Sequence, residues 1–79
     1  MREKHLRVVI AFHTTAEAMA TEKLCRAEGL EGRLISVPRQ ITSDCGLAWS
    51  APAELGHTLE ERLAARGITH AGFYELLLP

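Results

Sequence analysis

The stretch from Leu6 to Phe12 constrains the fold most, because a short apolar strand is followed at once by the start of a helix. These seven residues are almost all β-branched or apolar, which is typical of a central strand. Thr14 then has the position of a helix N-cap, and Glu17, three residues on, completes a capping box. Gly29 is placed to end this helix. The chain therefore opens with a strand and a helix joined by a minimal connection.

Three further strands and a second helix are predicted from the rest of the chain. Apolar runs at residues 32–37, 46–50 and 71–78 predict the strands, and residues 52–66 predict the helix. The order strand-helix-strand-strand-helix-strand is that of the ferredoxin-like split βαβ fold. Right-handed crossovers predict an α+β domain with a four-stranded antiparallel sheet and both helices on one face. The first and third strands are then central, and the second and fourth are edges.

The apolar periodicity predicts which side of each helix faces the core. The expected face of the first helix is Ala16, Ala20, Leu24 and Ala27. The expected face of the second helix is Leu55, Leu59, Leu63 and Ala64. Pro52 suits the first turn of the second helix, although Thr58 and Glu61 offer a later capping box and a start near Leu59.

Length, charge and composition exclude several classes of protein. The 79 residues predict a single small domain, with nine Lys and Arg against ten Asp and Glu. No basic block is present, so neither a nucleic-acid partner nor a membrane surface is expected. The four scattered histidines and the lack of a CxxC pair predict neither a metal site nor a cofactor. The apolar run after the charged residues 1–5 is too short for a signal segment, which predicts a cytoplasmic protein with reduced thiols.

The longest stretch without helix or strand periodicity is residues 37–47, and it contains Cys45. A hairpin in a small domain usually turns within two to five residues, and a longer connection more often has a function. The predicted topology brings this loop to the end of the sheet where the first helix begins. Cys45 is therefore expected to be partly exposed and to lie near His13, Thr14 and Thr15.

A thiol is useful for chemistry when its thiolate is stabilised. The unpaired N–H groups and positive dipole at a helix N-terminus, together with Arg39 and His13, would lower the pKa of Cys45. The carboxylate of Asp44 would oppose this effect. Gly46 places no side chain beside the sulfur and permits unusual backbone angles. These features predict a reactive Cys45, set against the alternative that a lone cysteine is simply a small buried hydrophobe.

Cys25 is expected to have no part in this chemistry. It lies about ten residues into the first helix, roughly 15 Å along the axis from its start. A disulfide needs the two Cα atoms within about 7 Å, so no bond between Cys25 and Cys45 is predicted. The residue is expected on a flank of the helix.

The motif Pro-Arg-x-Ile-x-Ser-x-Cys-Gly, at residues 38–46, resembles that of a family of small bacterial domains described as Se/S carrier protein-like. Weaker parts of the likeness are Phe-His-Thr-Thr at residues 12–15 and Glu-Lys-Leu at residues 22–24, so that it extends over nearly the whole chain. The resemblance implies that Cys45 carries sulfur or selenium as a persulfide or selenopersulfide. It also implies a donor protein, such as a cysteine desulfurase.

A binding or regulatory module is the alternative function. In that case Cys45 is a packing residue, while Thr14, Thr15 and Arg39 hold a small anionic ligand at the helix N-terminus. The apolar residues 73–78 form an edge that can pair with a second copy, which predicts a homodimer.

A thiol-dependent enzyme is the weakest alternative. His13 and His70 are the histidines expected nearest to Cys45, but they form no acid–base pair or triad with it that the sequence defines. Fold analogy alone does not choose among these functions. A carrier or binding protein is therefore expected in preference to a catalyst.

Overall fold

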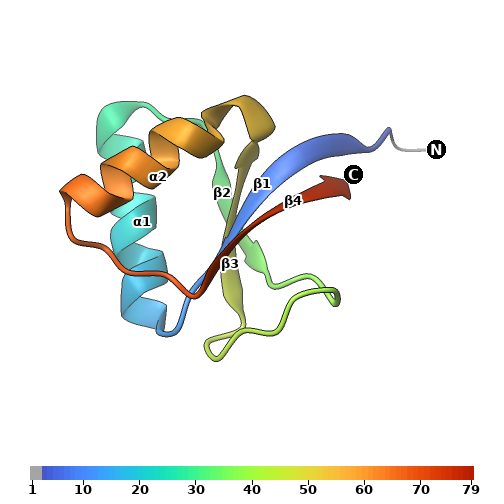
Figure 1. Cartoon of the computed structure of the whole chain (residues 1–79), viewed down its shortest axis with the longest axis horizontal. Coiled ribbons are helices and arrows are strands. Elements are labelled where there is room, and N and C mark those ends of the chain that lie inside the picture. Colours follow the sequence, from blue (N-terminus) through green and yellow to red (C-terminus); the bar gives the residue numbers. More distant parts are fainter. Residues whose placement is uncertain (1–2) are drawn as a thin grey trace.

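The computed structural model describes residues 3–79, and it has four antiparallel strands with two helices on one face (Figure 1). The elements are β1 (His5–Ala11), α1 (Thr15–Glu28), β2 (Arg33–Ser36), β3 (Leu47–Pro52), the 3₁₀ turn η1 (Ala53–Leu55), α2 (Gly56–Ala65) and β4 (Gly72–Leu78). The strand order β2-β3-β1-β4 confirms the predicted ferredoxin-like α+β fold. Met1 and Arg2, part of the charged N-terminal segment, lie outside the described residues.

The second half of the central strand β1 is buried on both of its faces. Val8, Ile10 and Phe12 point toward the helices, and Val9 and Ala11 point to the opposite face. All five are at most 2% exposed. This double burial explains why the sequence from Val8 to Phe12 is continuously apolar and does not alternate with polar residues.

The predicted N-terminal capping box of α1 is confirmed. The Thr14 hydroxyl accepts a hydrogen bond from the Glu17 N–H at 3.2 Å, and the Glu17 carboxylate accepts one from the Thr14 N–H at 3.1 Å. The helix ends at Gly29, whose φ of 68° is the left-handed conformation that glycine adopts without strain.

The buried face of α1 differs from the predicted one. Its buried residues are Ala18, Thr21, Leu24 and Cys25. The prediction was right at Leu24 and wrong at Ala16 and Ala27, which are exposed, and at Ala20, which is partly exposed. The helix buries Thr21 at low cost because its hydroxyl donates to a carbonyl one turn earlier at 3.0 Å. Cys25 packs beside it as a small apolar side chain and not on a helix flank.

The start of the second helix also differs from the prediction. Pro52 is the last residue of β3, because a residue without an N–H suits the end of a strand ladder. After η1, α2 begins at Gly56 without a side-chain cap, so neither the start at Pro52 nor the box of Thr58 and Glu61 forms. Leu59 and Leu63 are buried as predicted, whereas Leu55 is partly buried and Ala64 is exposed.

The two helices are joined at the surface by one forked ion pair. Arg62 of α2 donates from Nε and Nη2 to the two carboxylate oxygens of Glu28 in α1, at 2.8 and 2.6 Å. The hydrogen bonds from Arg62 hold the pKa of the Glu28 carboxyl below its usual value. Within residues 3–79, neither helix is both long and apolar enough to cross a membrane.

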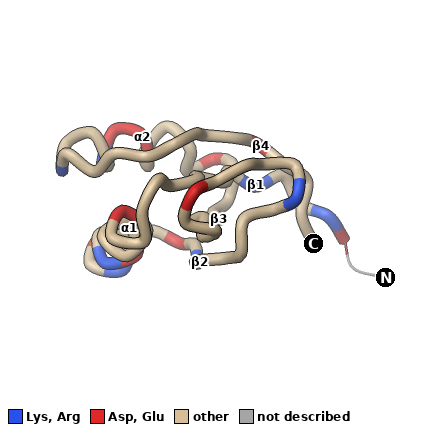
Figure 2. The backbone as a smooth tube through the Cα atoms, turned by 90° about the horizontal axis from the view of Figure 1, so that it is seen from below, with Lys and Arg blue, Asp and Glu red and all other residues tan. Residues whose placement is uncertain are grey.

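The long loop of residues 37–46 covers the face of the sheet opposite the helices. Its residue Ile41 is 6% exposed and packs with Val9, Ala11 and Ala48 in a second, smaller core. Figure 2 shows the helices on one side of the sheet and this loop on the other. The length of the loop therefore has a structural role, because a tight turn between β2 and β3 would leave this apolar surface uncovered.

Candidate functional site

The loop between β2 and β3 meets the C-terminal end of β1 at the end of the sheet where α1 begins (Figure 1). The Ser43 hydroxyl donates to the carbonyl oxygen of Phe12 at 2.8 Å. The carboxylate of Asp44 lies 3.6 Å from Nδ1 of His13, close enough for an ion pair when the imidazole is protonated. The predicted meeting of the loop with His13 is confirmed by these contacts.

Cys45 is partly exposed, as predicted, and its sulfur is held by close neighbours. The Leu47 N–H donates to Sγ at 3.4 Å, and Sγ donates to the Leu47 carbonyl at 3.6 Å. The Ser43 hydroxyl lies 4.0 Å from Sγ. The side chain also packs against the border of the core beneath the helices. The sulfur is therefore oriented by the protein, in a residue that is partly exposed to solvent.

Gly46 gives the chain the turn that follows Cys45. Its φ of 75° lies in the left-handed region, and a Cβ added there would meet no atom within 4 Å. Glycine is therefore required by the backbone conformation and not by lack of space. The Gly46 carbonyl accepts a hydrogen bond from the Val37 N–H at 3.0 Å, which closes the loop. This turn brings the backbone N–H and carbonyl of Leu47 next to Sγ of Cys45.

The start of α1 carries its own anion in the side chain of Glu17. One of its carboxylate oxygens accepts hydrogen bonds from the N–H groups of His13 at 2.7 Å and Thr14 at 3.1 Å, and the other accepts from the Thr69 hydroxyl. Desolvation is the largest single contribution and raises the pKa of Glu17, but the hydrogen bonds from Thr69, His13 and Thr14 and the charge of His13 together outweigh it and hold this pKa below its usual value. The N–H groups of His13, Thr14 and Glu17 at the start of α1 are thus already engaged.

The structure does not bring every predicted site residue to the sulfur. Among the hydrogen bonds and ion pairs of residues 3–79, none joins Cys45 to Thr14, Thr15 or Arg39. The Thr14 side chain caps α1, and the side chains of Thr15 and Arg39 are exposed. His13 reaches the loop through Asp44.

Two contacts of the sulfur were missed by reasoning from sequence. Ser43 was visible only as one letter of the motif at residues 38–46, two positions before Cys45. The contact from Leu47 is made by backbone atoms, and a backbone contact leaves no mark on the residue type.

His70 makes its ring contact with Phe73 and not with the sulfur site. Its ring packs edge-on against Phe73, with centroids 4.9 Å apart. Between residues 3 and 79, no hydrogen bond or ion pair links His70 to Cys45. In the same part of the chain, no group of three or more His, Cys, Asp or Glu side chains could hold a metal ion.

Cys25, the other free thiol, has an environment opposite to that of Cys45. It is fully buried in the core beneath the helices. Burial raises the pKa of the Cys25 thiol to about 11, and the negative charge of Glu28 adds to the effect. A thiol in this environment stays protonated and inaccessible at neutral pH.

The raised pKa of Cys25 predicts a loss of stability in alkali. Between the pKa of an exposed thiol and about 11, the unfolded chain gives up this proton while the folded chain keeps it. Stability therefore falls as pH rises through this range, by about 2 to 3 kcal/mol, and is fully retained below it. Urea unfolding near pH 8 and near pH 10.5 measures the change. The Cys25→Ala variant is the control, and its stability should decline less steeply than that of the wild type.

Comparison with known proteins gives one match, to a model of a protein family. The family is described as "Putative Se/S carrier protein-like", and its model matches residues 7–75. The matched residues include Cys45 and the whole motif at residues 38–46. No curated protein and no solved structure is significantly similar to the chain. The resemblance found in the motif is thus confirmed over most of the sequence, and the chain belongs to this Se/S carrier protein-like family.

Proposed function

We propose that the protein carries sulfur or selenium on Cys45, as a persulfide or selenopersulfide. The family description supports this class of function. The observation that favours Cys45 as the carrier is that the residue is partly exposed, with the Leu47 N–H donating to its Sγ at 3.4 Å. Cys25 is buried, protonated and out of reach of a partner protein. The sulfur or selenium atom is therefore proposed to bind to Cys45 and not to Cys25.

Loading needs no oxidant, because a persulfide donor already holds sulfur at the right oxidation level. The Cys45 thiolate attacks the terminal sulfur of a persulfide on the donor, for which a cysteine desulfurase is proposed. An Sγ–S bond forms, the S–S bond of the donor breaks, and the donor cysteine leaves as a thiolate that takes up a proton. Selenium follows the same course when the terminal atom is selenium. Delivery to an acceptor thiolate is the reverse exchange.

The neighbours of Cys45 are suited to a negatively charged sulfur. The Leu47 N–H already points at Sγ and can also donate to a thiolate or persulfide at this position. The Ser43 hydroxyl donates to the Phe12 carbonyl, but a hydroxyl can rotate and donate to Sγ, 4.0 Å away, once that sulfur loses its proton. Arg39, exposed in the same loop, supplies a mobile positive charge for the outer sulfur.

The contacts of Glu17 favour carriage over binding of an anionic ligand. A ligand held by Thr14 and Thr15 would need the donors at the start of α1. The Glu17 carboxylate accepts from the N–H groups of His13 and Thr14, so such a ligand would meet a like charge. We propose instead that the donor protein docks beside Cys45, on the surface around Thr14, Thr15 and His13.

Incubation with a cysteine desulfurase and cysteine tests the proposal. The reduced wild-type protein is expected to gain one sulfur atom per chain in its intact mass, and dithiothreitol should remove it. The Cys25→Ala variant serves as the matched control and should load to the same extent. A wild-type protein that gains no sulfur, while a known acceptor of the same desulfurase is loaded in parallel, would refute carriage.

A further inference from the structure

The two edges of the sheet differ in length. β2 has four residues and includes the charged Arg33, while β4 has seven residues and Glu75 is its one charged side chain. An edge strand presents unpaired N–H and C=O groups, which proteins usually protect by shortening the strand or adding charge. Each strand carries one charged side chain, but β2 is also protected by its short length, whereas β4 is long. β4 is therefore the edge that can accept another strand.

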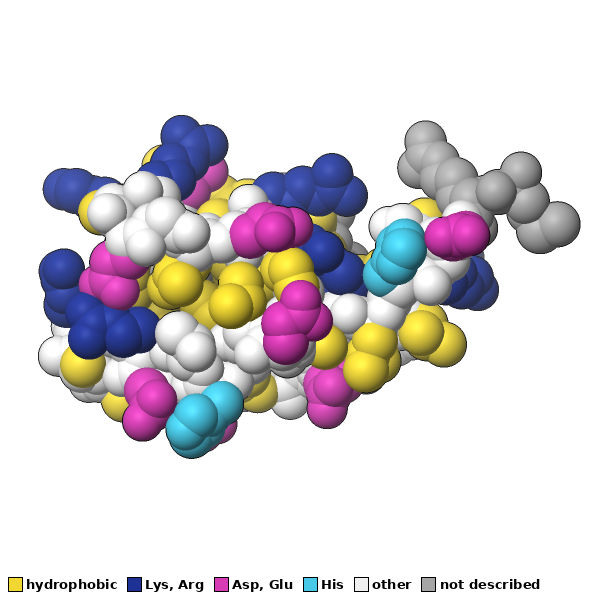
Figure 3. Space-filling model, turned by 90° about the horizontal axis from the view of Figure 1, so that it is seen from above, with side chains coloured by type: hydrophobic (Ala, Val, Ile, Leu, Met, Phe, Trp, Pro, Cys, Tyr) yellow, Lys and Arg dark blue, Asp and Glu magenta, His cyan; other side chains and the backbone are white. Residues whose placement is uncertain are grey.

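Large hydrophobic side chains lie exposed on and beside β4. Leu77 is 61% exposed, Leu6 is 48% exposed and Tyr74 is 39% exposed. Leu6 and Leu77 are cross-strand partners on β1 and β4, and strand alternation puts both on the same face as the helices. Figure 3 shows hydrophobic side chains reaching the surface between charged ones, also toward the end of the molecule with the N-terminus. Leu6 and Leu77 contribute hydrophobic free energy only when another surface removes them from water.

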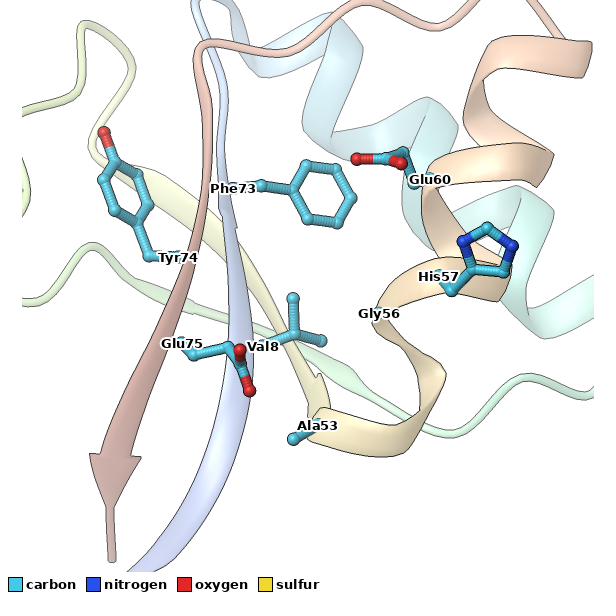
Figure 4. Close-up of a pocket in the computed structure, with 8 residues that line it drawn as sticks. All are labelled: Val8, Ala53, Gly56, His57, Glu60, Phe73, Tyr74 and Glu75. Atoms are coloured by element: carbon cyan, nitrogen blue, oxygen red, sulfur yellow. The ribbon is translucent and has the colours of Figure 1, made fainter.

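A hollow of about 400 Å³ lies between β4 and α2, on the same face as Leu77. Figure 4 shows Val8 and Phe73 pointing into it from the sheet, with Glu60 of α2 across from them. Glu75 stands at its border, two residues from Leu77 along β4. An exposed leucine thus lies next to a hollow that Val8 and Phe73 line together with the polar side chains of His57, Glu60 and Glu75.

We propose that β4 is a dimerisation edge, to which β4 of a second copy of the chain adds antiparallel about a two-fold axis at Leu76. The proposal does not depend on sulfur carriage. The cross-strand pairs between the two copies are then Leu76 with Leu76, Glu75 with Leu77, and Tyr74 with Leu78. Each Leu77 lies diagonally opposite Phe73 of the other copy, within reach of the hollow. Because a two-fold interface is isologous, both leucines and both hollows are used.

The other two registers that pair most of β4 are less favourable. An axis at Glu75 places the two Glu75 carboxylates directly opposite each other, which is destabilising. An axis at Tyr74 sets Glu75 against Phe73 at the hollow and leaves Leu77 without a cross-strand partner. The axis at Leu76 avoids like charges and pairs Leu77, the most exposed of these side chains.

Two substitutions of opposite charge at Leu77 test both the dimer and its register. Sedimentation of the wild type from about 1 to about 200 µM is expected to show a monomer–dimer equilibrium. Leu77→Glu puts a second carboxylate opposite Glu75 and should weaken the dimer about ten-fold or more. Leu77→Lys also removes the leucine but puts an ammonium opposite Glu75, so it should weaken the dimer clearly less than Leu77→Glu does. A wild type that stays monomeric throughout, or equal weakening by Glu and Lys, overturns the proposal.

Disulfide trapping gives an independent measure of the register. In a Cys45→Ser background, a Leu76→Cys thiol meets its own copy at a Cα separation of about 4.5 to 5.5 Å, which suits a disulfide. Tyr74→Cys is the control on the same face of β4, and its two copies are offset by about 13 Å along the strand. Mild oxidation should link the Leu76→Cys chains and leave the Tyr74→Cys chains single. Equal or faster linkage of Tyr74→Cys overturns the axis at Leu76.

Discussion

A protein in which Cys45 is replaced by serine is expected to fold like the wild type and to accept no sulfur. The chemistry requires a sulfur nucleophile, and a serine hydroxyl neither ionises near neutral pH nor forms a stable bond to sulfane sulfur. The loss should therefore be complete and not partial. Serine has nearly the shape of cysteine and can still accept the Leu47 N–H, so the loop should keep its conformation.

The intact mass and the unfolding curve of the Cys45→Ser variant are read together. An unchanged unfolding midpoint with no gain of sulfur is the expected pair of results. Removal of Cys25 by Cys25→Ala gives the opposite pair, with normal loading and lower stability from the space left in the core. Loading of Cys45→Ser to the wild-type level would remove Cys45 from the mechanism.

Replacing Trp49 by alanine is expected to unfold most of the protein. Trp49 is the largest of the fully buried side chains and is 1% exposed in the centre of β3. Its ring lies so close to Gly32 that a Cβ added there would be 2.5 Å from its Nε1. Loss of a buried tryptophan side chain costs about 3 to 5 kcal/mol. A domain this small has little more stability than that in total.

Two controls separate the packing of Trp49 from other effects in urea unfolding. Trp49→Phe should cost much less than Trp49→Ala, because Nε1 of Trp49 has no hydrogen-bond partner among residues 3–79 and no such bond is lost. Met19→Ala, at a side chain 52% exposed on α1, should change stability by less than about 0.5 kcal/mol. A Trp49→Ala protein with the wild-type unfolding midpoint would contradict the packing described for the core.

The strands, their order and the N-terminus of α1 were predictable because each depends on a local pattern. The apolar run of β1 and the spacing of Thr14 and Glu17 act within a few residues, and they need no knowledge of the rest of the chain. The order of the strands in the sheet then followed from the right-handed crossovers expected at the two helices. The loop at residues 37–46 could be placed at the start of α1 on the same grounds.

Other features were not predictable because they depend on tertiary contacts. The buried face of α1 includes Thr21, whose hydroxyl is satisfied by its own helix, so polarity gave the wrong orientation. The loop at residues 37–46 is long in part because Ile41 closes a second core, which no periodicity indicates. The carboxylate of Glu17 also takes a donor from Thr69, a residue far along the chain, and so occupies the helix start more fully than a capping box implies.

Peptide mapping of the loaded protein tests carriage by Cys45 most directly, because trypsin separates the two thiols. Cleavage after Arg39 and Arg62 gives peptide 40–62 with Cys45, and cleavage after Lys23 and Arg26 gives peptide 24–26 with Cys25. After loading by a desulfurase and capping with an alkylating reagent, the extra sulfur atom is predicted on peptide 40–62. An extra sulfur on peptide 24–26, or on neither peptide, would contradict carriage by Cys45.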